Sequence, residues 1–131
     1  MSEFAFFGED ARFHHVGLGV YSIEAAHPGA RVLTNQREGV SLAFVDLHGL
    51  TVELLEPLGE GSPIARNLQK GARLLHLCFE VPDLEVALER CRPAGFHRLR
   101  PPAESPALAN RRTVWVFSNE FGLFELLERS P

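Results

Sequence analysis

The sequence predicts an α+β fold in which two βαβββ modules form a curled, eight-stranded mixed sheet with helices on its convex face. An internal repeat is the first observation: FHHVGLGV (13–20) and RLLHLCFEV (73–81) each place a histidine directly before an aliphatic residue. The second is that an apolar strand, a glycine turn and a strand with a glutamate among hydrophobic residues follow each stretch, ending in VELLEP (52–57) and FELLER (124–129). Because side chains alternate along a strand, each histidine strand has one apolar face and one face that begins with an imidazole.

The first module, about 13–57, is expected to have strands at 13–20, 31–34, 40–46 and 51–56. Its helix is short, since Ser22 can cap it and Pro28 with Gly29 ends it after about two turns. A linker helix within about 58–72 begins near Ser62 and ends at Gly71. The second module, about 73–128, repeats this order, with strands at 74–81, 96–99, 113–118 and 123–128.

The helix of the second module is better defined than that of the first. Asp83 can cap DLEVALERCR, and the apolar residues of this segment recur at helical spacing. That stripe includes Cys91, which is therefore expected in the core. A proline-rich loop, 101–111, follows the short strand after this helix.

Length and composition indicate one domain, or two small fused modules that share a sheet, at 13–131 after an aromatic tail, 1–12. The 45% hydrophobic and 23% charged residues are ordinary for a soluble globular chain, and the net charge of -4 argues against nucleic acid as a partner. Two cysteines are too few for a disulfide scaffold, the N-terminus lacks a signal-peptide layout, and no apolar run approaches the roughly 20 residues that cross a bilayer. We therefore expect a cytoplasmic protein with reduced thiols and no membrane partner, and we expect it to form a homodimer.

Four side chains are expected on the concave face of the sheet: His15, Glu53, His76 and Glu125. The hydrophobic residues on either side of each glutamate belong against the core, so both carboxylates share a face with the two imidazoles. Two imidazoles and two carboxylates suit Co, Mn, Ni, Zn or Fe better than Ca. A single such residue is more often incidental, but four at equivalent places in two repeats predict a divalent metal site.

Two further glutamates, Glu56 and Glu128, lie three residues beyond the predicted ligands and have the opposite parity. We interpret them as structural or solvent-facing residues at strand ends. Other residues expected on the concave face are Ser41, Ala43, Cys78, Thr113, Trp115 and Phe117. Of these, Trp115, Phe117 and Cys78 are candidate contacts for a small-molecule acyl or aromatic substrate, although they could also fill the centre of the fold.

The stretches FHHVGLGV, VELLEPLGEGSPIARNL, LHLCFEVPDLEVALERC and LFELLE together resemble the vicinal oxygen chelate superfamily, which includes glyoxalases, bleomycin-resistance proteins and dioxygenases. Within it they are most similar to methylmalonyl-CoA epimerases and their relatives. The resemblance covers nearly all of 13–128 and implies a single vicinal oxygen chelate domain with a metal held by His15, Glu53, His76 and Glu125. It also implies an isomerase or lyase that acts through an enolate of an acyl-CoA or similar substrate, with the metal as Lewis acid.

In the epimerases that the chain resembles, two carboxylates exchange the α-proton of a thioester from opposite faces. The resemblance assigns one of these roles to Glu125. The other carboxylate stands two residues before a Gly-Val pair, which is Gly39-Val40 in this chain, and that position holds Arg37. Glu38 lies one residue away and is the candidate second catalytic residue, while Arg37 is a candidate group for binding a substrate carboxylate or phosphate.

Two other functions remain open from the sequence. A ring-cleaving dioxygenase of the same superfamily uses two histidines and one carboxylate, whereas four apparent ligands favour the enolate chemistry. A non-catalytic binding protein is the other alternative, and the retained ligand set argues against it.

Overall fold

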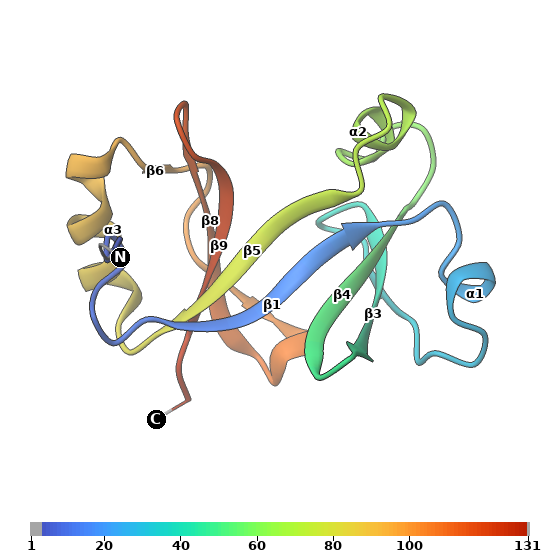
Figure 1. The fold of residues 1–131 in the computed structure, drawn as a ribbon, viewed down its shortest axis with the longest axis horizontal. Coiled ribbons are helices and arrows are strands. Elements are labelled where there is room, and N and C mark those ends of the chain that lie inside the picture. Colours follow the sequence, from blue (N-terminus) through green and yellow to red (C-terminus); the bar gives the residue numbers. More distant parts are fainter. Residues whose placement is uncertain (1–3, 131) are drawn as a thin grey trace. The chain divides into compact units, whose positions relative to one another are not determined.

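The computed structural model describes residues 4–130, which divide into two compact units (Figure 1). One unit is 15–76. The other consists of 77–130 together with the N-terminal residues 4–14, and is called the 77–130 unit below. Within 4–130, no helix is long and apolar enough to cross a membrane.

The 15–76 unit contains most of the first module. Its elements are β1 (Arg12–Gly19, which starts in the other unit), α1 (Ile23–Ala26), β2 (Leu33–Asn35), β3 (Val40–Leu47), β4 (Leu50–Pro57), α2 (Ala65–Gln69) and the start of β5 (Leu74–Val81). The strands follow the order β2-β3-β4-β1, with β2, β3 and β4 antiparallel and β4 parallel to β1. The linker helix is shorter than expected: it begins at Ala65 without a side-chain cap, because residues 62–64 form a turn.

The core of this unit lies on the face of the strands that α1 covers. Its buried members are Ile23, Ala43, Val52 and Leu54. The expected place of Ala43 on the concave face is therefore wrong, since this residue pairs with Leu54 and shares its face. The predicted parity of β4 is confirmed, because Val52 and Leu54 on either side of Glu53 both belong to the core.

The 77–130 unit repeats this arrangement with a longer helix. After β5 come α3 (Leu84–Cys91), the 3-10 turn η1 (Arg92–Ala94), β6 (His97–Arg98), β7 (Ala103–Ser105), the 3-10 turn η2 (Pro106–Leu108), β8 (Arg111–Ser118) and β9 (Gly122–Glu128). The order is β5-β9-β8-β6, and β7 pairs with β8. The α+β class and the repeated modules are confirmed, but residues 4–130 contain nine strands rather than eight, because part of the expected proline-rich loop forms β7.

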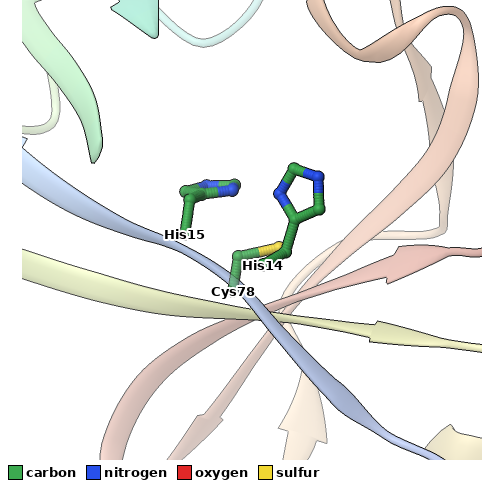
Figure 2. Close-up of side chains that lie close together, drawn as sticks. All are labelled: His14, His15 and Cys78. Atoms are coloured by element: carbon green, nitrogen blue, oxygen red, sulfur yellow. The ribbon is translucent and has the colours of Figure 1, made fainter. Parts of the chain in front are cut away.

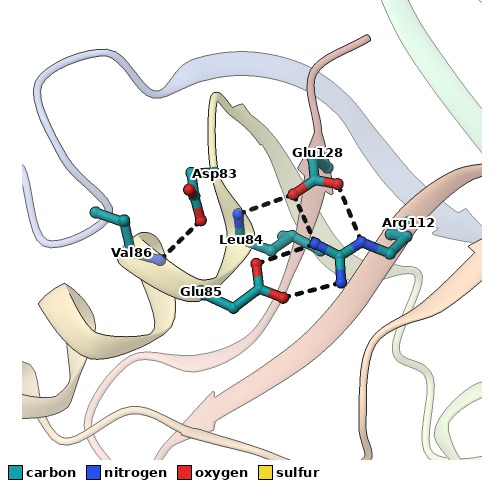
Figure 3. A network of polar contacts seen from close by, with 6 residues as sticks. All are labelled: Asp83, Leu84, Glu85, Val86, Arg112 and Glu128. Carbon is teal, nitrogen blue, oxygen red and sulfur yellow. Dashed lines mark hydrogen bonds and ion pairs between the residues drawn. The ribbon is translucent and has the colours of Figure 1, made fainter. Parts of the chain in front are cut away.

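Helices α1 and α3 begin in the same way, which confirms the structural role predicted for Glu56 and Glu128. Ser22 Oγ accepts a hydrogen bond from Ala25 N, and Asp83 Oδ1 accepts one from Val86 N. In addition, Glu56 Oε1 accepts from Ile23 N at 2.7 Å, and Glu128 Oε2 accepts from Leu84 N at 3.2 Å. Figure 3 shows the second of these starts, where Arg112 joins Glu128 and Glu85 beside α3. Each glutamate strand is thereby joined to the first turn of its own helix.

Two phenylalanines of the N-terminal segment pack into the core of the 77–130 unit. Phe7 is 6% exposed, and its ring centroid lies 5.2 Å from that of Phe96 and 5.5 Å from that of Phe124. Phe6 contacts the same two rings. Cys91 is buried in this core, as expected. The aromatic residues before β1 thus contribute to the core beside α3.

Candidate metal centre

Three of the four predicted ligands come together in the 15–76 unit. His15 Nε2 and His76 Nε2 lie 3.3 Å apart, and Glu53 Oε1 lies 3.4 Å from each of them. All three residues are buried, His15 completely. Both imidazoles therefore present their Nε2 atoms to the same carboxylate oxygen. The three residues come from three different strands: His15 from β1, Glu53 from β4 and His76 from β5.

The spacing of these atoms fits a metal ion. The corners of a nearly equilateral triangle with these edges lie about 1.9 Å from its centre, and Zn–N and Zn–O distances are about 2.0–2.2 Å. His15, Glu53 and His76 would therefore hold a divalent ion at normal bond lengths. Mixed imidazole and carboxylate ligands also match the donor preferences of divalent transition metals. The residues present fit such an ion.

Strand pairing places the carboxylate, and a glycine makes room for one imidazole. Gly17 is the parallel partner of Glu53, so the two residues lie side by side on β1 and β4. A Cβ atom at Gly17 would stand only 2.1 Å from His76 Cε1. The His76 ring can occupy this place only because residue 17 has no side chain. Sequence reasoning did not identify Gly17 as part of the site, although its place two residues after His15 on the same face was the available signal.

Phe44 of β3 lies next to the ligand triad, which consists of His15, Glu53 and His76. The sequence did not indicate this residue as part of the site. Phe44 pairs with Glu53 across β3 and β4, and its ring lies edge-on to His15 with centroids 5.2 Å apart. The same face of β3 carries Leu42, whose partner on β4 is Leu55. The surface beside the triad is therefore apolar, and it is not formed by Ser41 and Ala43 as expected.

Glu125, the fourth predicted ligand, belongs to the 77–130 unit. It is 6% exposed and lies on β9 between Trp115 of β8 and Cys78 of β5, which are its register partners. Trp115 is half-buried and Cys78 fully buried. Phe117, two residues further along β8 on the same face, is half-buried as well. The three predicted substrate contacts thus share a face of this unit with Glu125.

A histidine outside the predicted set also lies in this unit. A ring nitrogen of His14 lies within 4.8 Å of Cys78 Sγ, and Arg111 Nη2 donates to His14 Nε2 at 3.5 Å. Figure 2 shows the side chains of His14 and Cys78, together with His15, the next residue along β1. His14 therefore contacts polar groups of the 77–130 unit.

The turn between β2 and β3 carries the remaining candidates. Arg37 is exposed, and Glu38 is half-buried with its backbone N–H donating to Asn35 Oδ1 at 3.0 Å. Gly39 has a φ of 69°, which favours glycine, and the ring of Pro63 lies against it. Arg37 and Glu38, the two residues before Gly39, therefore differ in burial, and Glu38 is the more enclosed.

Comparison with known proteins identifies relatives. A family model described as the Glyoxalase/Bleomycin resistance protein/Dioxygenase superfamily matches residues 14–114. The ethylmalonyl-CoA/methylmalonyl-CoA epimerase of Cereibacter sphaeroides is 41% identical over 95 residues, which cover 64% of this chain and 71% of that protein. The mitochondrial methylmalonyl-CoA epimerase of Homo sapiens is 38% identical over 88 residues, 59% of this chain and 50% of that protein, so the alignment spans half of the human relative.

Among solved structures, the methylmalonyl-CoA epimerase from Mycobacterium tuberculosis superimposes with a TM-score of 0.75 at 25% identity. The superposition covers 91% of this chain and 88% of that chain. The range matched by the family model contains His15, Glu53 and His76 and ends before Glu125.

Proposed function

We propose that this chain, which belongs to the glyoxalase/bleomycin resistance protein/dioxygenase superfamily, is a metal-dependent epimerase that acts on an acyl-CoA through an enolate. The triangle of His15 Nε2, His76 Nε2 and Glu53 Oε1 is the observation that carries the proposal. These three atoms form a ligand set for a divalent ion. The chain that carries them is 41% identical to an ethylmalonyl-CoA/methylmalonyl-CoA epimerase over 95 residues. Methylmalonyl-CoA and ethylmalonyl-CoA are therefore the first substrates to test.

Glu125 completes the proposed ligand set. It stands in FELLER where Glu53 stands in VELLEP, and the resemblance to the epimerases assigns it the same role. A bound divalent ion supplies positive charge that stabilises an oxyanion developing at the substrate. Co, Mn, Ni, Zn and Fe all accept imidazole and carboxylate ligands, and the chemistry of the residues does not select among them.

In this proposal the side chains of the protein move the proton and exclude water. Glu125, nearly buried beside Trp115 and Cys78, takes the α-proton from one face of the substrate. Glu38 is the candidate for the opposite face, since it is the half-buried carboxylate of the β2–β3 turn. Trp115 and Phe117 provide apolar surface for the acyl group, and Cys78 fills the space beside Glu125. Arg37, which is exposed, is the candidate partner for an anionic part of the ligand.

We further propose a cytoplasmic homodimer. Cys78 and Cys91 are both buried and form no disulfide within residues 4–130, which suits a reducing compartment. The 15–76 unit exposes several large apolar side chains, among them Val32 at 44%, Leu47 at 46% and Leu50 at 38%, and a second copy of the chain would cover such surface. Sedimentation analysis tests the proposed homodimer directly, since a monomer at micromolar concentration would contradict it.

Hydrogen exchange at the substrate α-carbon tests the activity. Metal-loaded protein incubated with methylmalonyl-CoA or ethylmalonyl-CoA in deuterium oxide should add one deuterium per molecule, measured by mass spectrometry. Glu125→Gln should slow the exchange by about 10²–10⁴-fold, because it removes the general base. Glu120→Gln, an exposed change in the turn between β8 and β9, is the matched control and should leave the rate unchanged. Metal-loaded wild type that exchanges neither substrate would contradict the proposal.

A further inference from the structure

We propose that Arg111 is the central residue of an anion-binding subsite for the substrate, on the same face of the 77–130 unit as Glu125. The subsite takes an anionic oxygen group, either a carboxylate of the acyl part or a phosphate of coenzyme A. This inference rests on the proposed function, because it concerns the thioester that the site would bind.

The strand register places Arg111 on the face of Glu125. On β8, Arg111 has the parity of Thr113 and Trp115, and Trp115 pairs with Glu125. The intervening residues of β8 belong to the core, and Arg112 reaches Glu85 and Glu128 beside α3 on that other side (Figure 3). Two adjacent arginines therefore have opposite roles: Arg112 stabilises the helix side, and Arg111 lies on the face with the proposed base.

Glu80 sets the position of the guanidinium along the strands. Glu80 lies two residues beyond Cys78 on β5, and Cys78 is the register partner of Glu125. Two strand residues span about 6.6–6.8 Å, so the Glu80 level is about that far from the Glu125 level. Arg111 Nη1 donates to Glu80 Oε2 at 2.8 Å, which holds the guanidinium near this level. A ligand with its reacting carbon at Glu125 could thus extend along the strands to Arg111.

Positive charge exceeds negative charge at this place. Glu80 accepts hydrogen bonds from two guanidiniums, Arg111 and Arg129, the second at 3.0 Å. Among residues 4–130, Glu80 is the one carboxylate that forms an ion pair with either of them. The Arg111 side chain is only 19% exposed, so water screens its charge incompletely. An incoming anion would compensate the second positive charge.

Arg111 also retains hydrogen-bonding capacity. A guanidinium has five N–H groups. In the described chain, Arg111 Nε donates to Leu108 O at 3.4 Å, Nη1 to Glu80 and Nη2 to His14 Nε2 at 3.5 Å. The remaining N–H groups are held in a fixed orientation by these contacts, and a preorganised fork of this kind is suited to the oxygens of a carboxylate or phosphate.

Calorimetric titration with four unreactive or slowly reacting thioesters tests the subsite: malonyl-CoA, acetyl-CoA, malonyl-pantetheine and acetyl-pantetheine. Arg111→Gln should weaken binding about tenfold or more, the usual effect of losing a charge-assisted hydrogen bond. Weaker binding of both malonyl thioesters alone identifies the acyl carboxylate as the anion. Weaker binding of both CoA thioesters alone identifies a phosphate. Arg111→Lys keeps the charge but not the fork, and should recover part of the affinity while preserving the ion pair with Glu80.

The control variant is Arg92→Gln, which removes an arginine whose side chain is 70% exposed at the end of α3 and should leave all four affinities unchanged. Unchanged binding of every thioester by folded Arg111→Gln, or an equal loss for all four, would overturn the subsite and leave the proposed function intact. Wild type that binds none of the four thioesters would instead contradict the proposed function itself, and the subsite with it.

Discussion

The imidazole of His76 lies over Gly17 so closely that a Cβ atom at residue 17 would stand 2.1 Å from His76 Cε1 and 2.9 Å from His76 Nε2. Gly17→Ala should therefore displace a proposed ligand and lower metal affinity by about tenfold or more, as changes beside metal ligands usually do. Gly61→Ala is the control, because a Cβ there meets open space. Metal titration of both variants measures the effect. Wild-type metal affinity in Gly17→Ala would show that metal binding does not require the His76 ring to lie over residue 17.

The ligand triad itself predicts that metal stabilises the folded protein. Because an ion binds the assembled ligands and not the unfolded chain, excess Mn, Co, Ni or Zn should raise the melting temperature of wild type, with about 2.7 kcal/mol of stabilisation at a hundred times the dissociation constant. His76→Ala should abolish this shift and release bound metal. Identical melting of the wild type with and without each of these ions would count against the metal site.

The packing of Phe7 predicts that the N-terminal segment contributes to stability. Phe7→Ala removes a ring that is 6% exposed among Phe96, Phe124 and Phe79, and should destabilise the fold by about 3–5 kcal/mol. Phe4→Ala is the matched control, since Phe4 is 81% exposed and its loss should have little effect. Urea unfolding of both variants measures the difference, and equal free energies of unfolding would contradict the prediction.

The carboxylate of Glu128 should contribute to the stability of the folded protein in a pH-dependent way. Its hydrogen bonds to Arg112 hold the pKa of this carboxyl below its usual value, and the backbone N–H of Leu84 acts in the same direction. A group whose pKa is lower in the folded state contributes stability above its unfolded pKa and loses that contribution as pH falls through its folded pKa. Glu128→Gln should thus lower the melting temperature at pH 7, and the difference should shrink below about pH 4.5.

The control for this comparison is Glu60→Gln, an exposed change in the turn after β4 that should alter melting little at either pH. A Glu128→Gln difference that stayed constant from pH 7 to pH 3 would mean that the ion pair with Arg112 is not its cause.

The repeat allowed much of this arrangement to be predicted, because alternation in β1 and β5 assigns His15 and His76 to a face opposite their aliphatic neighbours. The face of β3 could not be assigned in the same way. Its sequence VSLAFV has small or apolar residues at every position, so either parity gives a buried strand. Only the register with β4, which pairs Phe44 with Glu53, decides that Phe44 lies beside the ligands and Ala43 in the core.

Two other features depend on contacts between distant parts of the chain. The need for glycine at residue 17 arises from the His76 ring: alternation along β1 puts Gly17 on the face of His15, but it does not reveal which distant side chain lies against it. Strand β7 is short and lies next to prolines, which favour a loop, but its pairing with β8 stabilises it as a strand. In both cases tertiary contacts determine the local structure.

Arg37 leads to the last prediction, which concerns how the configuration at the α-carbon changes. A 1,1-proton transfer with inversion needs a proton acceptor on one face of the carbanion and a donor on the other. Arg37 stays protonated at any working pH and is a poor base, whereas Glu38 is a half-buried carboxylate in the same turn. Glu38 lies one residue from the position to which the resemblance assigns the second base, so it should transfer protons on the second face more slowly than Glu125 does on the first. Deuterium exchange at the α-carbon should therefore be faster than inversion in the wild type.

Arg37→Glu should raise the rate of inversion relative to exchange, because it puts a carboxylate at the position to which the resemblance to epimerases assigns the second base. Glu38→Gln should lower the same ratio. The measurement follows deuterium uptake by mass spectrometry and optical rotation in parallel, with methylmalonyl-CoA as substrate. Inversion as fast as exchange in the wild type, unaffected by Glu38→Gln, would mean that a group other than Glu38 protonates the second face. Exchange and inversion rates that both stay unchanged in Arg37→Glu would show that residue 37 does not reach the substrate.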